Sequence, residues 1–296
     1  MRAPVRRPGL TDRSTPIRSR SVSRYPDPYR EVDAQADPSK LLESLEVRAR
    51  TPSHARLRRR FLRFVPIRRG DDVLEVGCGT GPILRDLITL VGPRGRVVGV
   101  DNSRNAVRAA RLLCQGHGRP HQLAVRLADG GRLPFAAGRF DATIAITVVL
   151  HVADPLALTR EMARVTRPGG RVGLQDQDFG AVVVSHPDRV LTERILRGVV
   201  DRMYEEPFSG RRLPSLLREA GLTDVRVRTS VYEDARLVPW TKNFLERRAE
   251  LAVRFEIVGP GEAQHWLDGF TALVAAGAFV FTINYYGAVG VTAMRA

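Results

Sequence analysis

Short apolar runs alternate with amphipathic stretches through the middle of the chain. The runs lie at 73–76, 96–100, 123–127, 140–149 and 171–175, and their many β-branched residues are typical of strands buried on both faces of a parallel sheet. Between them, apolar residues recur at spacings of three and four, which predicts helices. Strands that alternate with helices in this way predict an α/β fold with a doubly wound, mostly parallel sheet.

Beyond residue 175 the pattern is less regular. Helices are expected at 190–200 and 213–220, followed by an alternating strand at 225–232. A helical pair is expected within 234–276, and the β-branched and aromatic run at 279–291 predicts a last strand. These additions are expected to include elements that cap the sheet.

The amino-terminal part of the chain differs in composition from the rest. Residues 1–38 are rich in arginine, serine and proline and have no apolar period, which predicts a disordered tail. Leucine and phenylalanine then recur at helical spacing up to residue 65 and predict an amphipathic helix with a basic outer face. Alternatively, one arginine of this helix closes over an anionic group of a ligand. We expect a tail at 1–38 and a domain at 39–296, with a core at 71–175 and cap elements at 39–66, 176–210 and 234–276.

The net charge of +15 is concentrated in two segments. Residues 1–30 hold eight arginines and two aspartates, residues 48–69 hold nine arginines and no acid, and the remainder is neutral. Arginine makes up 45 of the 47 basic residues, a bias that fits a GC-rich coding sequence better than selection for phosphate contacts. The chain has only two cysteines and no apolar run typical of a membrane span, so we expect a cytoplasmic protein.

The first strand ends in a turn with three glycines in alternate positions, Gly77, Gly79 and Gly81. Pro82 suits the first turn of a helix, so the glycines lie where a strand turns into a helix. The missing side chains let a ligand approach the backbone, and the N–H groups of the helix start face it. Asp101 follows the second strand, where an acid reaches the ribose hydroxyls of a nucleotide.

Two features of this turn bear on the type of nucleotide. A dinucleotide site needs a third glycine at the position that Pro82 occupies. Glu75 precedes the glycines, and its carboxylate would lie badly against a pyrophosphate but well beside an ammonium group. The residues therefore favour a ligand that carries an ammonium group over a dinucleotide.

The run from Glu75 to Gly81 resembles motif I of the class I S-adenosylmethionine-dependent methyltransferases. Later landmarks of that family match in order: Asp101, Asp129, the segment from Phe140 to His151, and the Arg-Pro-Gly-Gly turn at 167–170. The resemblance is specific over 71–175 and weaker over 210–292, and is greatest to the ubiquinone and menaquinone biosynthesis and natural-product small-molecule methyltransferases. It implies a seven-stranded, Rossmann-like methyltransferase sheet with helical cap insertions, S-adenosylmethionine as cofactor and S-adenosylhomocysteine as product.

The resemblance also implies which residues hold the cofactor. Glu75 and the glycines lie against its methionine part, and Asp101 accepts both ribose hydroxyls. Asp129 accepts the adenine amino group, although it could instead cap its loop. The end of the fourth strand lines the methyl-donor end, and Cys78 contributes its backbone. The expected cofactor residues are Glu75, Gly77, Cys78, Gly79, Gly81, Asp101, Asn102, Asp129, Gly130, Ile146 and Thr147.

Methyl transfer is an in-line displacement, so alignment and exclusion of water supply most of the catalysis and a general base is optional. The candidates for a base or a substrate contact are His151, Asp176 and Asp178. His151 could instead anchor the next loop, and the two aspartates could be solvated loop acids. No spacing of histidines and carboxylates suits a metal ion.

The expected acceptor is a small molecule that is methylated on oxygen, nitrogen or carbon in specialised metabolism. Aromatic residues of the cap segments suit a closed pocket for it: Phe179, Tyr204, Phe208, Trp240 and Phe244. We expect a monomer or homodimer with no nucleic-acid or membrane partner. The basic segments leave a nucleic-acid methyltransferase as an alternative, although no Asn/Asp-Pro-Pro-aromatic box follows the fourth strand. A second alternative is a relative that binds the cofactor without transferring its methyl group.

Overall fold

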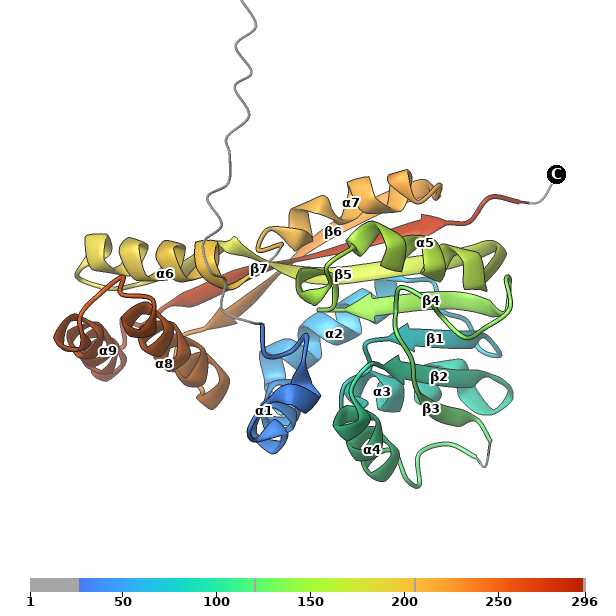
Figure 1. Ribbon diagram of the computed structural model, residues 1–296, viewed down its shortest axis with the longest axis horizontal. Helices are drawn as coiled ribbons and strands as arrows, with labels where there is room; N and C mark the ends of the chain where they lie inside the picture. The colour runs from blue at the N-terminus through green and yellow to red at the C-terminus, as the bar shows by residue number, and fades with distance from the viewer. Residues whose placement is uncertain (1–26, 120, 205, 295–296) are drawn as a thin grey trace, which may run out of the picture.

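The computed structural model describes residues 27–119, 121–204 and 206–294. They form a seven-stranded sheet with the order β3-β2-β1-β4-β5-β7-β6 (Figure 1). The strands are β1 (Asp72–Val76), β2 (Arg96–Asp101), β3 (Leu123–Leu127), β4 (Phe140–Ile146), β5 (Thr166–Val184), β6 (Thr223–Asp234) and β7 (Phe281–Val291). Neighbouring strands are parallel except around β7, which runs antiparallel to β5 and β6. The predicted doubly wound, mostly parallel sheet of seven strands is confirmed.

Helices cover both faces of this sheet. They are α1 (Pro38–Arg50), α2 (Pro52–Phe64), α3 (Pro82–Val91), α4 (Arg104–Leu113), α5 (Pro155–Val165), α6 (Arg189–Met203), α7 (Ser209–Glu219), α8 (Pro239–Arg254) and α9 (Pro260–Ala275). One face packs on α2, α3 and α4 through residues such as Phe61, Leu87 and Val107. The other face packs on α5 and α7 through Met162 and Leu216. No helix in the described part of the chain is long and apolar enough to cross a membrane.

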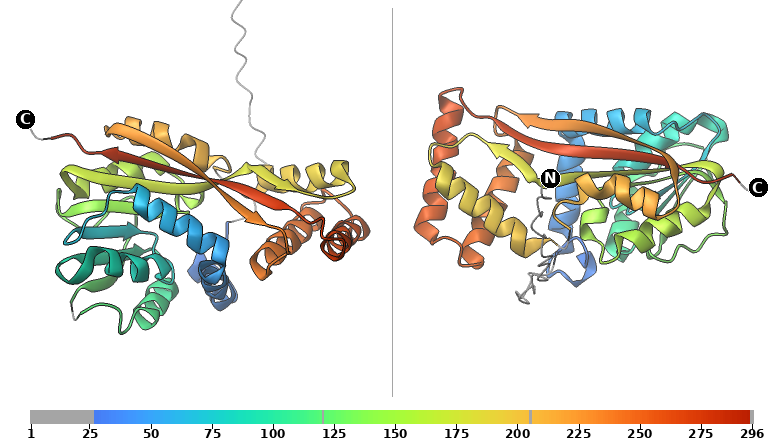
Figure 2. Two further views of the ribbon diagram at one scale, coloured as in Figure 1. Left: turned by 180° about the vertical axis from the view of Figure 1, so that it is seen from behind. Right: turned by 90° about the horizontal axis from the view of Figure 1, so that it is seen from above.

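The three strands at one edge run well past the others and carry a cap. Figures 1 and 2 show β5, β6 and β7 extending beyond the short strands to α6, α8 and α9. Trp266, Phe270 and Phe281 lie in the apolar core of this extension. The predicted end of the fifth strand at residue 175 is wrong, because the strand continues to Val184 by pairing with β7. The predicted turn at 167–170 is a bulge within this strand.

The predicted amphipathic helix at 38–65 is two helices. Proline disfavours the helical conformation of the residue before it, and Thr51, which precedes Pro52, is extended with φ −62° and ψ 123°. The chain bends there, so that α2 lies on the sheet while α1 lines the large cavity described below. The break gives α1 a position that one continuous helix could not reach.

Part of the predicted tail packs against the domain. Residues 1–26 lie outside the described residues, but Asp27 and Val32 are buried. The carboxylate of Asp33 accepts hydrogen bonds from the Ser103 hydroxyl and from the backbone N–H of Arg104, at the start of α4. The expected boundary at residue 38 is therefore too late, because the 27–37 segment fastens to the sheet's second strand-helix turn.

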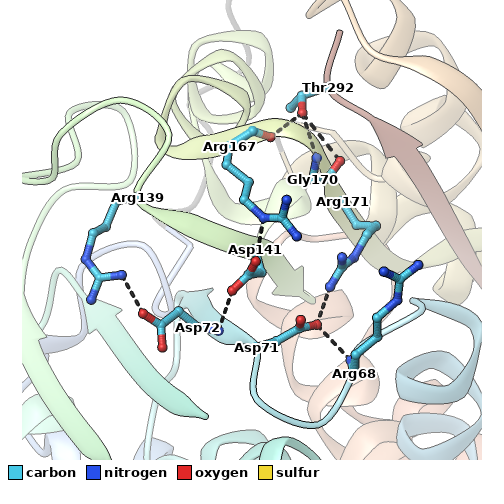
Figure 3. Close-up of polar contacts among 9 residues, drawn as sticks. All are labelled: Arg68, Asp71, Asp72, Arg139, Asp141, Arg167, Gly170, Arg171 and Thr292. Atoms are coloured by element: carbon cyan, nitrogen blue, oxygen red, sulfur yellow. Dashed lines mark hydrogen bonds and ion pairs between the residues drawn. The ribbon is translucent and has the colours of Figure 1, made fainter. Parts of the chain in front are cut away.

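An ion-pair network closes the sheet at the amino ends of β1, β4 and β5. Figure 3 shows Arg171 pointing at Asp71, and both side chains are buried. Asp71 also accepts the Arg68 N–H at 2.7 Å, while Asp72 pairs with exposed Arg139 at 2.6 Å. Burial lowers the pKa of Arg171. The network lies at the opposite end of the strands from the glycine turn, so it stabilises the fold without contacting the site.

Candidate active site

A cavity of about 960 Å³ lies at the carboxyl ends of the parallel strands. One end, here called the turn end, is lined by the glycine turn at 77–79 and by residues that follow β2 and β3, at 101–102 and 128–131. The other, the cap end, is lined by Gln177, Phe179, Tyr204, Trp240, Phe244 and Arg248. Arg48 and His54 from α1 and α2 also line the cavity. It is large enough to hold two small ligands in contact with one another.

The glycine turn adopts a backbone that only glycine accepts. Gly77 has φ +72°, and a Cβ atom there would lie 2.4 Å from Cγ2 of Val148. The N–H groups of Gly77 and Cys78 both donate to the carbonyl oxygen of Val100 at 2.8 and 2.9 Å. The turn is thereby fixed against β2. Gly81, also at positive φ, caps α3 and is buried behind the cavity wall.

Asp101 and its neighbours form the wall beside this turn. One Asp101 carboxylate oxygen accepts the Gly79 N–H at 2.8 Å and the other accepts the Ser103 N–H at 3.0 Å. Burial raises its pKa, and these hydrogen bonds oppose that rise. Asn102 and Asp129 line the cavity as well, and Asp129 holds its loop by accepting the Gly131 N–H at 3.0 Å. The structure thus gathers the predicted ribose and adenine residues at the turn end.

Glu75 lies beneath the turn rather than in the cavity wall. Its side chain is fully buried, and neither carboxylate oxygen has a hydrogen-bond partner among the described residues. Burial, with a smaller effect from Asp101, raises the pKa of Glu75 well above its ordinary value. A buried carboxyl group without a donor is costly, so it fits a ligand that brings a cationic or hydrogen-bonding group to this turn. These residues fit S-adenosylmethionine.

The side chain of Cys78 points into the core, while its backbone N–H helps to fix the turn. Its thiol is buried, and burial raises the pKa of that thiol well above its ordinary value. A thiol held protonated in an apolar core is a poor nucleophile.

The end of β4 holds a strained residue at the junction of the two ends of the cavity. Thr147 has φ +56°, which is unusual for a β-branched residue. Its N–H donates to the Gln175 carbonyl at 2.7 Å, and its hydroxyl accepts from Arg48 at 3.1 Å. Strain held in place by such contacts is common at functional sites. Ile146 and Thr147 both line the cavity, in the position expected of the donor end.

The three candidate catalytic residues have different surroundings. His151 lines the cavity, and its Nδ1 atom lies 2.5 Å from a carboxylate oxygen of Asp27. Asp176 is fully buried behind the wall and accepts the N–H groups of Leu150 and Gln177. Asp178 is also fully buried and pairs with Arg211. Of the three candidates, only His151 lines the cavity. The alternative interpretation of the two aspartates as solvated loop acids is wrong, because both are fully buried.

The cap end contains most of the aromatic residues expected there. Phe179 stacks on Tyr204 with ring centroids 4.4 Å apart, and Trp240 stacks on Phe244 at 5.6 Å. Phe208 does not line the cavity and stays exposed beneath the Arg211 guanidinium. The aromatic pocket is therefore built from β5, the end of α6, and α8.

Among the polar residues of the cavity region that were not predicted from the sequence, five bear on the site. Arg48 donates to Thr147, Gln177 and Tyr285, and the Tyr285 hydroxyl lies 3.2 Å from Nε2 of buried His54. The fifth is Arg248, which lines the cap end. Only the arginine-rich pattern around residue 48, with the suggestion that one arginine closes over a ligand, pointed toward any of them. The others are single residues inside helices and strands and gave no signal.

Residues 74–174 match the family described as "Methyltransferase domain". The sheet order, the glycine turn and the strand-end cavity agree with this match to a methyltransferase domain. A putative methyltransferase structure from Bacillus halodurans shares the fold, with a TM-score of 0.55 at 18% identity, over 80% of this chain and 99% of that one. The predicted fold is confirmed, and the match over residues 74–174 agrees with the predicted family.

Three relatives show how similar the chain is in sequence to known proteins. The chain is 33% identical over 222 residues to an uncharacterized 37.1 kDa protein in transposon TN4556 of Streptomyces fradiae, which covers 74% of this chain and 62% of that protein. It is 40% identical over 116 residues to the nocamycin O-methyltransferase of Saccharothrix syringae, covering 39% and 41% of the two chains. It is 28% identical over 189 residues to the demethylmenaquinone methyltransferase of Halalkalibacterium halodurans, covering 59% and 77%. The chain thus spans less than two thirds of the first two relatives.

Proposed function

We propose that the protein transfers a methyl group from S-adenosylmethionine to a small, partly apolar molecule, as the natural-product and quinone methyltransferases among its relatives do. One observation carries the proposal. One cavity joins the glycine turn and Asp101, which suit the cofactor, to an aromatic cap end that suits an acceptor. The name of the nocamycin relative favours oxygen as the atom that is methylated.

When bound, the cofactor supplies an electrophilic methyl group on a sulfonium. The turn at 77–79 and the Asp101 carboxylate would hold its amino acid and ribose parts, with Glu75 beneath the turn. The aromatic cap end would shield the acceptor from water and align it with the methyl group. Alignment and exclusion of water supply most of the rate enhancement of a methyl transfer. His151 reaches the cavity and can hold or accept an acceptor proton.

The arginine-rich segment gives little support to the nucleic-acid alternative. Arg50, Arg56 and Arg58 pair with Glu46, Glu233 and Asp86. Arg48 bonds into the cavity wall, so at least four of the nine arginines at 48–69 have partners within the protein. Absence of nucleic-acid partners, a cytoplasmic location and a monomeric or homodimeric state stay predictions.

Titration calorimetry with S-adenosylmethionine and S-adenosylhomocysteine tests the cofactor part of this proposal. Asp101→Ala should weaken binding at least about tenfold, because one charged hydrogen-bond acceptor is lost. Glu219→Gln, an exposed acid at the end of α7, serves as the control and should bind like the wild type. Absence of binding by the wild-type protein would refute the proposal.

The acceptor part is tested by incubating the protein and radiolabelled S-adenosylmethionine with a small-metabolite extract and, separately, with total RNA. Label is expected in an organic-soluble product. Label only in RNA would establish the alternative instead, and cofactor binding without transfer to either would favour a non-methylating relative.

A further inference from the structure

Arg248 is a buried cation that pairs with no carboxylate in the described part of the chain. Its side chain, on α8, is 3% exposed and lines the cap end of the cavity. It donates one hydrogen bond to the Tyr204 hydroxyl at 3.1 Å and one to the Met203 sulfur at 3.3 Å. Among the described residues, no carboxylate lies within ion-pair distance of it, whereas the buried Arg171 pairs with Asp71. A buried guanidinium ordinarily needs such a partner.

Aromatic rings surround this cation on several sides. Its central carbon lies 4.8 Å from the ring centroid of Phe179, 5.3 Å from that of Tyr204 and 4.6 Å from that of Phe244. Cation–π contacts of this kind offset part of the cost of burial, but they use the faces of the rings and leave the N–H donors of the guanidinium fork unused. Two of the five donors bond to acceptors among the residues that the structure describes, and the others can serve an anion.

A second cation lies nearby on the same wall. Arg48 donates to the Gln177 side chain, and Gln177 and Phe179 of β5 both line the cavity. All of the described acceptors of Arg48 are neutral oxygens. The described acids that line the cavity are Asp37, Asp101, Asp129 and Asp154, none of which comes from β5, α6 or α8. The cap end is thus positively charged and apolar.

We propose that Arg248 binds an anionic oxygen group of the methyl acceptor, so that the substrate is a small aromatic or apolar acid rather than an amine or a neutral lipid. The inference rests on the proposed function, whose acceptor it specifies. The planar guanidinium fork suits a carboxylate or an ionised phenol or enol, and the ring cage accommodates the apolar remainder. A protonated amine would be repelled by both arginines and by the sulfonium of the cofactor.

The test uses the full chain saturated with S-adenosylhomocysteine and three matched pairs of probes: benzoate and benzamide, 2-naphthoate and 2-naphthamide, 3-phenylpropionate and 3-phenylpropionamide. Calorimetry, or quenching of the fluorescence of Trp240 in the cap end, gives the affinity of each probe. In at least one pair the wild type should bind the acid about tenfold more tightly than the amide, which is the worth of a charged hydrogen bond. Equal or absent binding of acid and amide in all three pairs overturns the proposal.

Variants distinguish the effect of the Arg248 charge from that of any other positive charge on α8. Arg248→Met should abolish the preference for the acid, and Arg248→Lys should keep part of it. Lys242→Met removes an exposed charge of the same helix and should leave the preference unchanged. A preference that survives in a folded Arg248→Met protein overturns the assignment, and if that variant does not fold, Arg248→Lys and the wild-type pairs still decide. Failure of S-adenosylhomocysteine to bind the wild type would count against the proposed function instead, because the probe comparison can be repeated without it.

Discussion

The Nδ1 atom of His151 and a carboxylate oxygen of Asp27 lie 2.5 Å apart beside the cavity. The carboxylate accepts the proton of Nδ1, so the neutral imidazole keeps its lone pair on Nε2. Asp27 comes from the segment before α1, and the ring of Tyr29, two residues on, lies 5.3 Å from the ring of His151. The amino-terminal segment therefore sets the orientation of the one candidate base that lines the cavity.

Replacing these two residues should show whether His151 acts in catalysis or only holds the 27–37 segment in place. His151→Ala should lower kcat about a hundredfold if His151 acts as a general base. Asp27→Asn should lower kcat by about tenfold, because the ring loses its oriented tautomer. Cofactor affinity measured by calorimetry should change little in either. The rates are measured as S-adenosylhomocysteine released with the acceptor found in the metabolite extract.

His117→Ala provides the control, since this exposed histidine lies outside the cavity and its ring contacts the Gln115 carbonyl of its own loop. It should retain the wild-type rate. If His151→Ala also retains the wild-type kcat, the histidine is an anchor for the 27–37 segment and no base.

Gly77→Ala should abolish cofactor binding. The new Cβ would lie 2.4 Å from Val148, and the residue would also have to hold φ +72°. Gly70→Ala is the matched control, because Gly70 has φ +93° but nothing within 4 Å of an added Cβ. Each should lose about 1–2 kcal/mol from the backbone conformation, as measured by urea unfolding, and only Gly77→Ala should lose affinity for S-adenosylhomocysteine. Loss of affinity in both would mean that global destabilisation, and not the clash, is responsible.

The core could be predicted because its signals are local. The glycine turn from Gly77 to Gly81 and Asp101 are sequence features that the strand ends bring to one edge of the sheet, whatever the rest of the chain does. The cap could not be predicted in the same way. The continuation of β5 to Val184 depends on pairing with β7, about a hundred residues later in the chain, and the cation of Arg248 meets Phe179 and Tyr204 only after α8 has packed. Such contacts leave no period or motif in the sequence.

Asp176 should make the stability of the protein depend on pH. Burial raises its pKa from 3.8 to about 6. The folded protein then holds a proton that the unfolded chain releases, so the free energy of unfolding falls as the pH rises from about 4 through about 6, and then levels off. The fall due to this group is about 3 kcal/mol at most.

The variant Asp176→Asn cannot ionise and should lack this part of the fall. It should also be less stable at low pH, because an amide has one acceptor oxygen for the two N–H groups, of Leu150 and Gln177, that the carboxyl group accepts. Urea unfolding of both proteins between pH 4 and pH 8 measures the difference, and the remaining acids titrate in both. Parallel curves for the two proteins would contradict the prediction.

The buried pair of Arg171 and Asp71 should matter for stability far more than its exposed neighbour. Arg171→Met leaves the Asp71 carboxylate buried, with the Arg68 N–H as its one remaining donor among the described residues, which should cost about 3–5 kcal/mol in the free energy of unfolding. Arg139→Met breaks the pair between Arg139 and Asp72. The Arg139 side chain is 39% exposed, so this loss should cost about 1 kcal/mol or less in the free energy of unfolding.

The double variant Arg171→Met/Asp71→Asn distinguishes the loss of an ion pair from the loss of packing. Removing the stranded charge should recover part of the stability lost in Arg171→Met, and a double variant less stable than either single variant would show that the guanidinium acts mainly by filling space. Affinity for S-adenosylhomocysteine should be unchanged in every folded variant, because Asp71 precedes β1 and the glycine turn follows it. The same strand therefore carries a stability determinant at its amino end and the cofactor turn at its carboxyl end, and these measurements test whether the two are independent.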